Sequence, residues 1–460
     1  MDSSEVSPGV CAELPVCGRL AQRIIERLDN SAPLDDLFSV VIEMAKEWEQ
    51  QTAVPSTRTI GVFEDENEDA HEHLRVLFHT LNRKTLRSLL LGTLPYDLYD
   101  EDSPKWENMY NQDGPGTYLI GISVEDRRGA FLSGNEVREV IDHIRDYKAG
   151  CEAWVLLEDA YGDSQVSHAQ ALSLEKAYAI ENTMLSEDDQ WEEGDEYVRP
   201  RYLTGKGKKT IKNIEEMIAM LSKRVDARFD GDVHQISCPP YVGCGHRVPA
   251  RLLQHDPNYS SMASSSNVLK LLISCIRRIG LKPIVHTIPM IMVWEESQIP
   301  LAEMLVTVLA QSLISINGLN VAQPGTSQGS GDRNEDLYFK TKRYVWINRP
   351  WFMENIQKSL AFKLNRDLYI DAFDTINERY MDEAQMTKYM KDNDELEGHV
   401  EYLKIQINQI LDERKAEQET AKETIAEIDR FLNSSTGMFP DLLEDEGEDG
   451  DEGETDVIVD

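Results

Sequence analysis

The distribution of apolar residues constrains the fold of this chain most, because segments that can be buried alternate with segments that cannot. Residues 187–196 contain seven acids and no base, residues 326–335 contain no apolar side chain, and the last 20 residues contain 11 acids and no base. Such segments cannot form a packed core. They divide the 460 residues into candidate folded regions, and the last one predicts a disordered acidic tail over 435–460.

The first half of the chain is predicted to hold a helical region and then an α/β unit. Apolar residues recur at helical spacing through 1–110, for example over 34–48. After the turn at 113–116, the pattern predicts strand, helix, strand and helix over 114–185, with the second strand at 153–157. An acidic and then basic linker with a helix follows at 186–229.

The second half repeats this order and ends in long helices. Strand, helix, strand and helix are expected again over 230–325, followed by a linker at 326–335. A helical region at 336–434 contains apolar residues in the a/d pattern of a coiled coil: Leu396, Val400, Leu403, Ile407 and Ile410. This coiled coil, at 396–434, predicts a partner helix, in the same chain or in another. The fold class is therefore mixed α/β and helix-rich.

The composition excludes several classes of protein. The formal net charge of −36 argues against a surface that binds nucleic acid all over, so any such contact must be local. The acidic start of the chain is unlike a signal peptide, and the longest apolar stretch, around 283–294, is too short to cross a membrane. Six cysteines in a chain of this length suggest reduced thiols. We expect an intracellular protein, nuclear or cytoplasmic, with no membrane contact.

The most informative motif is Tyr-Val-Gly-Cys-Gly-His-Arg-Val-Pro-Ala-Arg-Leu-Leu-Gln-His at 241–255. It resembles the GIY-YIG nuclease family, in which a triplet of this type precedes an arginine ten residues after the tyrosine, commonly as Arg-Leu-x-x-His. The family then places a glutamate on a helix and an asparagine before a turn, and Glu303 and Asn320 resemble these two. The resemblance covers 241–325 and implies a small GIY-YIG-like domain at 230–325.

The resemblance implies roles for five residues in a metal-dependent nuclease that cleaves DNA, for example branched or damaged DNA. Glu303 would hold one Mg²⁺ or Mn²⁺, Tyr241 would be the base, and Arg251 would bind the phosphate. Asn320 and His255 would order the site. Such chemistry needs a proton acceptor, a cation for the phosphoryl charge and a stabilised leaving oxygen.

Local charge and one missing residue also bear on this hypothesis. Residues 241–294 contain six bases and one acid, a net charge of +5 in an acidic protein. The family's first signature tyrosine is expected shortly before Tyr241, where none occurs. The segment 115–118, Pro-Gly-Thr-Tyr, has a suitable sequence but lies more than a hundred residues earlier. We interpret it either as the start of a degenerate second copy or as a coincidence.

Three alternatives remain at this stage. The first is a catalytically inactive GIY-YIG-like scaffold that binds proteins through its coiled coil and acidic tail. The second is a zinc site, because four potential ligands occur within 238–255, although their spacing matches no usual set. The third concerns the end of the chain, where Val457, Ile458 and Val459 within an acidic segment resemble a SUMO-interacting motif and would favour a nuclear location.

Overall fold

The structure is a computed structural model. It describes residues 17–51, 63, 68–99, 113–159, 166–225, 231–255, 257, 262, 265–322, 324–325, 334–347, 349–390 and 396–436. The predicted acidic tail at 435–460 lies outside these residues except for its first two, which end a helix, and the predicted SUMO-interacting motif lies outside them entirely. The described chain divides into two units, 1–366 and 367–460.

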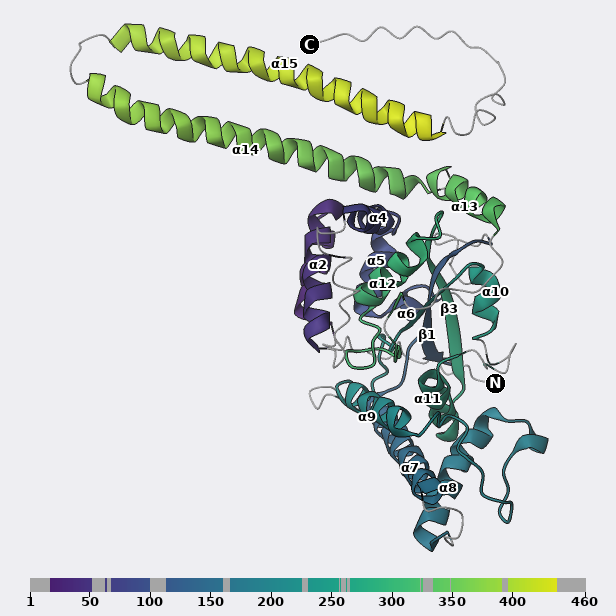
Figure 1. The fold of residues 1–460 in the computed structure, drawn as a ribbon. Coiled ribbons are helices and arrows are strands. Elements are labelled where there is room, and N and C mark those ends of the chain that lie inside the picture. The colour runs from purple at the N-terminus through teal and green to yellow at the C-terminus, as the bar shows by residue number, and fades with distance from the viewer. Residues whose placement is uncertain are drawn as a thin grey trace, which may run out of the picture. The chain divides into compact units, whose positions relative to one another are not determined.

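Helices dominate the structure, and three strands form one sheet (Figure 1). The predicted mixed α/β, helix-rich class is therefore confirmed. The first unit contains, in chain order, α1 (Arg19–Asp29), α2 (Leu34–Gln51), α4 (Glu68–His79), α5 (Arg83–Leu91), α6 (Leu94–Asp97), β1 (Gly116–Val124), α7 (Gly134–Asp159), α8 (His168–Glu181), α9 (Lys208–Ser222), β2 (Tyr241–Gly245), α10 (Val248–Leu253), α11 (Asn267–Arg278), β3 (Pro283–Met292), α12 (Gln298–Ala310) and α13 (Glu335–Ile347).

The sheet is antiparallel and has the order β2-β1-β3. Strand β1 is buried at every position, as expected for a central strand whose sequence is almost wholly apolar. Helix α12 lies on one side of the sheet and α10 on the other (Figure 1). The prediction of a separate α/β unit at 114–185 is wrong, because β1 is the central strand between β2 and β3. A domain limited to 230–325 would lack this strand.

The strand predicted at 153–157 is also wrong. These residues continue helix α7, which runs without a break from Gly134 to Asp159. A short apolar run does not distinguish a strand from a buried helical segment. The tertiary structure favours the helix here, since Gly150 lets α8 approach closely: a Cβ at this position would lie 2.6 Å from the Ala177 Cβ.

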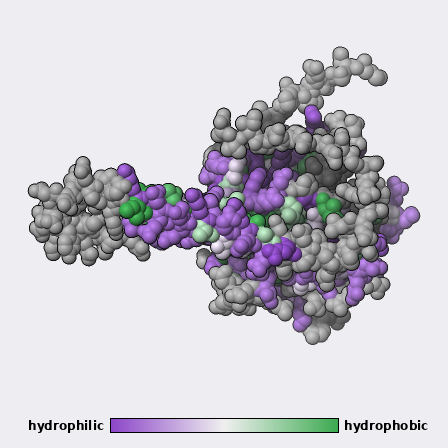
Figure 2. Space-filling view, turned by 90° about the horizontal axis from the view of Figure 1, so that it is seen from above, coloured by the Kyte–Doolittle hydropathy of each residue, from purple (hydrophilic) through white to green (hydrophobic). Residues whose placement is uncertain are grey.

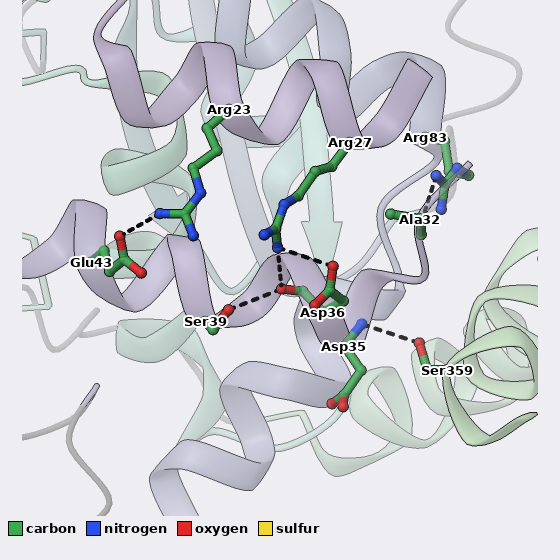
Figure 3. Close-up of polar contacts among 9 residues, drawn as sticks. All are labelled: Arg23, Arg27, Ala32, Asp35, Asp36, Ser39, Glu43, Arg83 and Ser359. Atoms are coloured by element: carbon green, nitrogen blue, oxygen red, sulfur yellow. Dashed lines mark hydrogen bonds and ion pairs between the residues drawn. The ribbon is translucent and has the colours of Figure 1, made fainter. Parts of the chain in front are cut away.

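The N-terminal helices are joined by ion pairs that their sequence spacing alone does not reveal. Arg23 of α1 pairs with Glu43 of α2 at 2.9 Å, and Arg27 pairs with Asp36 at 3.0 Å (Figure 3). Helix α1 buries its apolar face beneath these contacts, at Ala21, Ile24, Ile25 and Leu28. Within 1–110, the described residues form the helices α1, α2, α4, α5 and α6.

Helix α14 (Pro350–Met390) begins against this N-terminal region. Ser359 accepts a hydrogen bond from the Asp35 backbone N–H at 3.1 Å (Figure 3) and contacts His79 Nε2 at 2.9 Å. The Asn355 amide donates to the backbone carbonyls of His79 and Leu81. The first turns of α14 therefore belong to the first unit, although they are distant from it in sequence.

The second unit consists of the rest of α14 and of α15 (Leu396–Thr436). Arg414 of α15 pairs with Asp371 of α14 at 3.3 Å, which fits an antiparallel pair within one chain. The described surface of α15 is mainly hydrophilic with isolated hydrophobic residues (Figure 2), and Ile407 is 50% exposed. The coiled coil itself stays a prediction. Within the described residues, no helix is long and apolar enough to span a membrane.

Candidate functional site

The sheet brings two tyrosines together from segments far apart in the sequence. Tyr118 of β1 lies directly opposite Gly243 of β2, and Ile120 lies opposite Tyr241. Side chains two residues apart on a strand share a face, so Tyr118 and Tyr241 lie on the same face of the sheet. Gly243 is required beneath the Tyr118 ring, because a Cβ there would collide with the phenol. The Tyr-Val-Gly triplet is thus shaped to receive a tyrosine from β1.

His255 lies between the two tyrosines. Its ring centroid is 5.3 Å from that of Tyr118 and 5.8 Å from that of Tyr241. Its Nε2 lies 2.8 Å from the Tyr118 hydroxyl oxygen, and its Nδ1 lies 2.7 Å from the Ser265 hydroxyl oxygen. Both ring nitrogens of this fully buried histidine are therefore engaged, in a continuous hydrogen-bonded chain from Tyr118 to Ser265.

Arg251 of α10 approaches the same tyrosine. Its charge opposes the rise in the pKa of Tyr118 that burial causes, and its Nη1 donates to Gln254 Oε1 at 2.6 Å. When the Tyr118 O–H donates to His255 Nε2, His255 Nδ1–H can donate to Ser265. Each group in this arrangement has a matching donor or acceptor.

Glu303 is the one ionisable side chain of α12, a helix that is buried almost throughout. Its Oε2 accepts a hydrogen bond from the Gly325 N–H at 2.8 Å, and the Cys244 side chain also hydrogen-bonds to it. The Glu303 charge raises the pKa of Tyr241, but its partner Cys244 lies three residues after Tyr241 on β2 and therefore points to the opposite face of the sheet. Among the described residues, no lysine or arginine forms an ion pair with it. A buried carboxylate without a cation is a candidate for function.

Asn320 contacts the backbone of β2 rather than the side-chain cluster of Tyr118, Tyr241, Arg251 and His255. Its Oδ1 accepts from the Val242 N–H at 2.8 Å, and its Nδ2 donates to the Val242 carbonyl at 2.7 Å. Its amide therefore pairs with the free edge of β2 as another strand would. Asn320 fixes the strand that carries Tyr241, and both polar atoms of its side chain are used in doing so.

Burial sets the protonation of this cluster. It raises the pKa of Tyr118 well above the ordinary value, with a further rise from Tyr241 and an opposing effect from Arg251. It also raises the pKa of Tyr241, where the Glu303 charge adds to the rise. Burial, assisted by Arg251, lowers the pKa of His255 to about 4. At neutral pH both tyrosines are therefore protonated and His255 is neutral, so His255 is the available proton acceptor.

Glu303 offers one carboxylate to a divalent cation, and one of its oxygens already accepts the Gly325 N–H. Mg²⁺ is commonly bound through one or two carboxylates, with water completing its coordination. Burial raises the pKa of Glu303, and a cation would offset the cost of its charge. The described residues contain no group of three or more His, Cys, Asp or Glu side chains able to hold a metal, so neither Mg²⁺ nor zinc has a preformed set of protein ligands among them.

The local positive charge of 241–294 is partly neutralised in the fold. Arg247 pairs with Asp113, and Lys282 pairs with Glu125 at 2.8 Å. Arg277 donates to the Thr183 carbonyl at 3.1 Å. The net charge of +5 counted along the sequence therefore overstates the charge available to a phosphate. Arg251 is the member of this set that reaches the cluster.

A cleft of about 360 Å³ opens beside the cluster. Tyr241, Asn320 and Ser265 form the wall nearest the cluster, and Lys209 and Asn213 of α9 line it as well. Since Ser265 also contacts His255, the cleft is joined directly to the hydrogen-bonded chain that ends at Tyr118. A ligand in this cleft would contact Tyr241 and Asn320 directly, whereas Arg251, His255 and Glu303 do not line it.

Sequence reasoning placed Tyr241, Arg251, His255, Glu303 and Asn320 in one site. The structure brings Tyr241, Arg251 and His255 near one another, whereas Asn320 bonds to the Val242 backbone and Glu303 bonds to Gly325. It missed Tyr118 as a member, treating the segment 115–118 as a second copy or a coincidence. The signal was present, because Gly243 opposite a buried strand leaves room for one large ring. Because residues 125–240 separate β1 from β2, the pairing of Tyr118 with Gly243 is not evident from the sequence.

A comparison of the chain with protein-family models, curated proteins and solved structures finds no match.

Proposed function

We propose that the protein is a metal-dependent nuclease that cleaves DNA phosphodiesters at the cluster of Tyr118, Tyr241, Arg251, His255 and Glu303. The observation that supports this proposal is the position of Tyr118, which stands beside Tyr241 across β1 and β2. It supplies the tyrosine that the GIY-YIG resemblance otherwise lacks. The resemblance then involves a complete set of side chains on one sheet and the helices beside it.

The protonation states of Tyr118, Tyr241 and His255 suggest the catalytic role of each residue. Arg251 would bind a phosphoryl oxygen through its planar guanidinium. A water near Tyr118 would pass its proton to the phenol as the phenolic proton moves to His255, which is neutral and hydrogen-bonded to it. His255, rather than Tyr241, is then the final proton acceptor. A cation on Glu303 would supply charge stabilisation for the phosphoryl oxygens and the leaving group.

Cleavage of labelled branched, flapped and single-stranded DNA by the full chain, in Mg²⁺, Mn²⁺ or EDTA, tests the proposal. Glu303→Gln should reduce metal-dependent cleavage by at least about 100-fold, and Tyr118→Phe by a similar factor. Glu181→Gln is the matched control for Glu303→Gln, since Glu181 is also a buried helical glutamate with a raised pKa, held by Tyr147 and outside the cluster. Equal cleavage by Glu303→Gln and Glu181→Gln would refute the proposal.

A protein-binding scaffold is the second candidate function. The observation that favours it is the exposure of apolar side chains in the second unit, where Tyr369 is 74% exposed and Ile405 is 55% exposed. The two functions differ in their response to two changes. A scaffold loses partner binding when 386–460 is deleted and is indifferent to Glu303→Gln, whereas a nuclease loses cleavage in Glu303→Gln and keeps its partners.

A further inference from the structure

The cleft beside Tyr241 has a second wall that the resemblance does not provide. This wall is α9, which belongs to residues 125–240 between β1 and β2. Thr210, Asn213 and Ile214 of α9 face the start of α11 across the cleft. The long segment that separates β1 from β2 thus returns to the candidate site and closes one side of it. Its contribution there is chemical as well as structural.

Two groups on α9 are available to a ligand. Lys209 is exposed and forms no ion pair with any residue that the structure describes. The half-buried Asn213 amide likewise has no hydrogen-bond partner among those residues. The other side chains that line the cleft are hydroxyl, amide or apolar groups, and none is a carboxylate. The protein has a net charge of −36, yet this cleft has no carboxylate in its wall and one free ammonium group. Such a lining favours an anionic, hydrogen-bonding ligand.

Further positive charge lies near this cleft. Arg201 and Lys270 are close enough to interact, since burial and then the Arg201 charge lower the pKa of Lys270. Lys208 is exposed at the first position of α9, next to Lys209. The turn before α9 uses Gly205 and Gly207 at positive φ, which lets the basic segment 206–209 fold back into the helix. Among these basic residues Lys209 lines the cleft, and Arg201 and Lys270 are the sequence neighbours of the lining residues Tyr202 and Leu271.

The size of the cleft limits the ligand. A volume of about 360 Å³ is near the lower end of small-molecule sites, which span roughly 300–1,000 Å³. This size suits a ligand of about one nucleotide rather than a stretch of stacked duplex. A base that is paired and stacked in a duplex would have to leave the helix to enter, whereas an unpaired base enters without that cost.

We propose that this cleft binds one unpaired nucleotide of the DNA strand, beside Tyr241. Lys209 contacts the phosphate of that nucleotide, and the Asn213 amide contacts its base or sugar. The proposal rests on the proposed nuclease function and specifies its substrate class as DNA with an unpaired nucleotide at the site of cleavage. Ser265 lines the cleft and hydrogen-bonds to His255, so it connects the bound nucleotide to the proton acceptor.

Binding in EDTA tests the inference without cleavage. The full chain is titrated into a short fluorescein-labelled oligothymidylate and into a labelled duplex, and the fluorescence anisotropy is followed. We expect the single strand to bind at least about tenfold more tightly than the duplex. Lys209→Ala should weaken its binding about fivefold and reduce the slope of log K against log salt concentration by about 0.7, the value for one phosphate contact in a single strand.

Two further variants make the result specific. Lys212→Ala is the matched control, since Lys212 lies one turn further along α9, pairs with Glu216 at 3.7 Å and does not line the cleft. It should change binding less than about twofold and leave the salt slope unchanged. Asn213→Leu keeps the side-chain size and removes the amide, so it should weaken binding about fivefold with an unchanged slope. Circular dichroism establishes that each variant is folded.

The results separate this inference from the proposed function. Equal effects of Lys209→Ala and Lys212→Ala, or equal affinity for strand and duplex, would overturn the inference even if the protein cleaves DNA. The expected binding pattern in a protein that cleaves none of the DNA substrates with Mg²⁺ or Mn²⁺ would overturn the nuclease function and leave the nucleotide site standing.

Discussion

The contact between Gly243 and Tyr118 gives the sharpest test of the structure. In Gly243→Ala, the new methyl group would lie 2.5 Å from the Tyr118 Cζ, well inside van der Waals contact. Tyr118 is 1% exposed and its hydroxyl is held by His255, so the ring cannot move away freely. Overpacking of this kind costs about 1–3 kcal/mol. We therefore expect the free energy of unfolding to fall by about 2 kcal/mol, measured by urea denaturation.

Two comparisons identify the contact as the cause. Gly245→Ala, on the same strand, places its methyl group 3.7 Å from the Arg251 side chain, so it should be neutral or slightly stabilising. In a Tyr118→Leu background, the ring is absent and Gly243→Ala should lose most of its cost. The double-mutant cycle should give a coupling of at least about 1 kcal/mol. Additive effects would refute the register of β1 against β2, and with it the place of Tyr118 in the site.

Three other predictions concern stability. Burial lowers the pKa of His255 to about 4 from its usual 6.5, so between these pH values the unfolded chain binds one more proton than the folded protein. The free energy of unfolding should therefore fall by about 3 kcal/mol as the pH drops through this range. His255→Gln should remove this part of the pH dependence of the urea midpoint, and an unchanged dependence in that variant would contradict the prediction. Arg224 is fully buried and donates to the Ser237 carbonyl at 3.0 Å and to Asn317 Oδ1 at 2.8 Å, so Arg224→Ala should cost about 3 kcal/mol or more, measured as a fall in thermal midpoint. A fragment of residues 225–330 lacks the central strand and should show no cooperative unfolding transition by circular dichroism, whereas a sharp transition would show that β2 and β3 fold without β1.

The features that depend on neighbouring residues could be predicted from the sequence. Helical spacing of apolar residues predicted α1 and α2, because an amphipathic pattern needs only the local chain and one buried face. The segment 241–255 predicted a strand, a turn and a helix, with Arg251 and His255 following Tyr241 in the sequence. This was possible because these elements are continuous in the chain. The mixed α/β, helix-rich class followed from the same patterns.

The features that depend on residues distant in the chain could not be predicted from the sequence. Residues 153–157 are apolar enough for a strand, and only the packing of α7 against α8 decides for a helix. The local excess of positive charge was visible in sequence, but the acids that neutralise Arg247 and Lys282 come from 113 and 125. Counting charges along a segment does not reveal which of them acquire partners in the fold.

The composition of the candidate site shows the same division. The sequence by itself determined the residue types and the order of Tyr241, Arg251, His255, Glu303 and Asn320. Only the tertiary structure decided that Tyr118 joins them and that α9 closes the cleft. The physical reason is that strand pairing is a long-range interaction: hydrogen bonds and the space above Gly243 select the partner strand, and the length of the intervening loop adds only a slowly growing entropic cost.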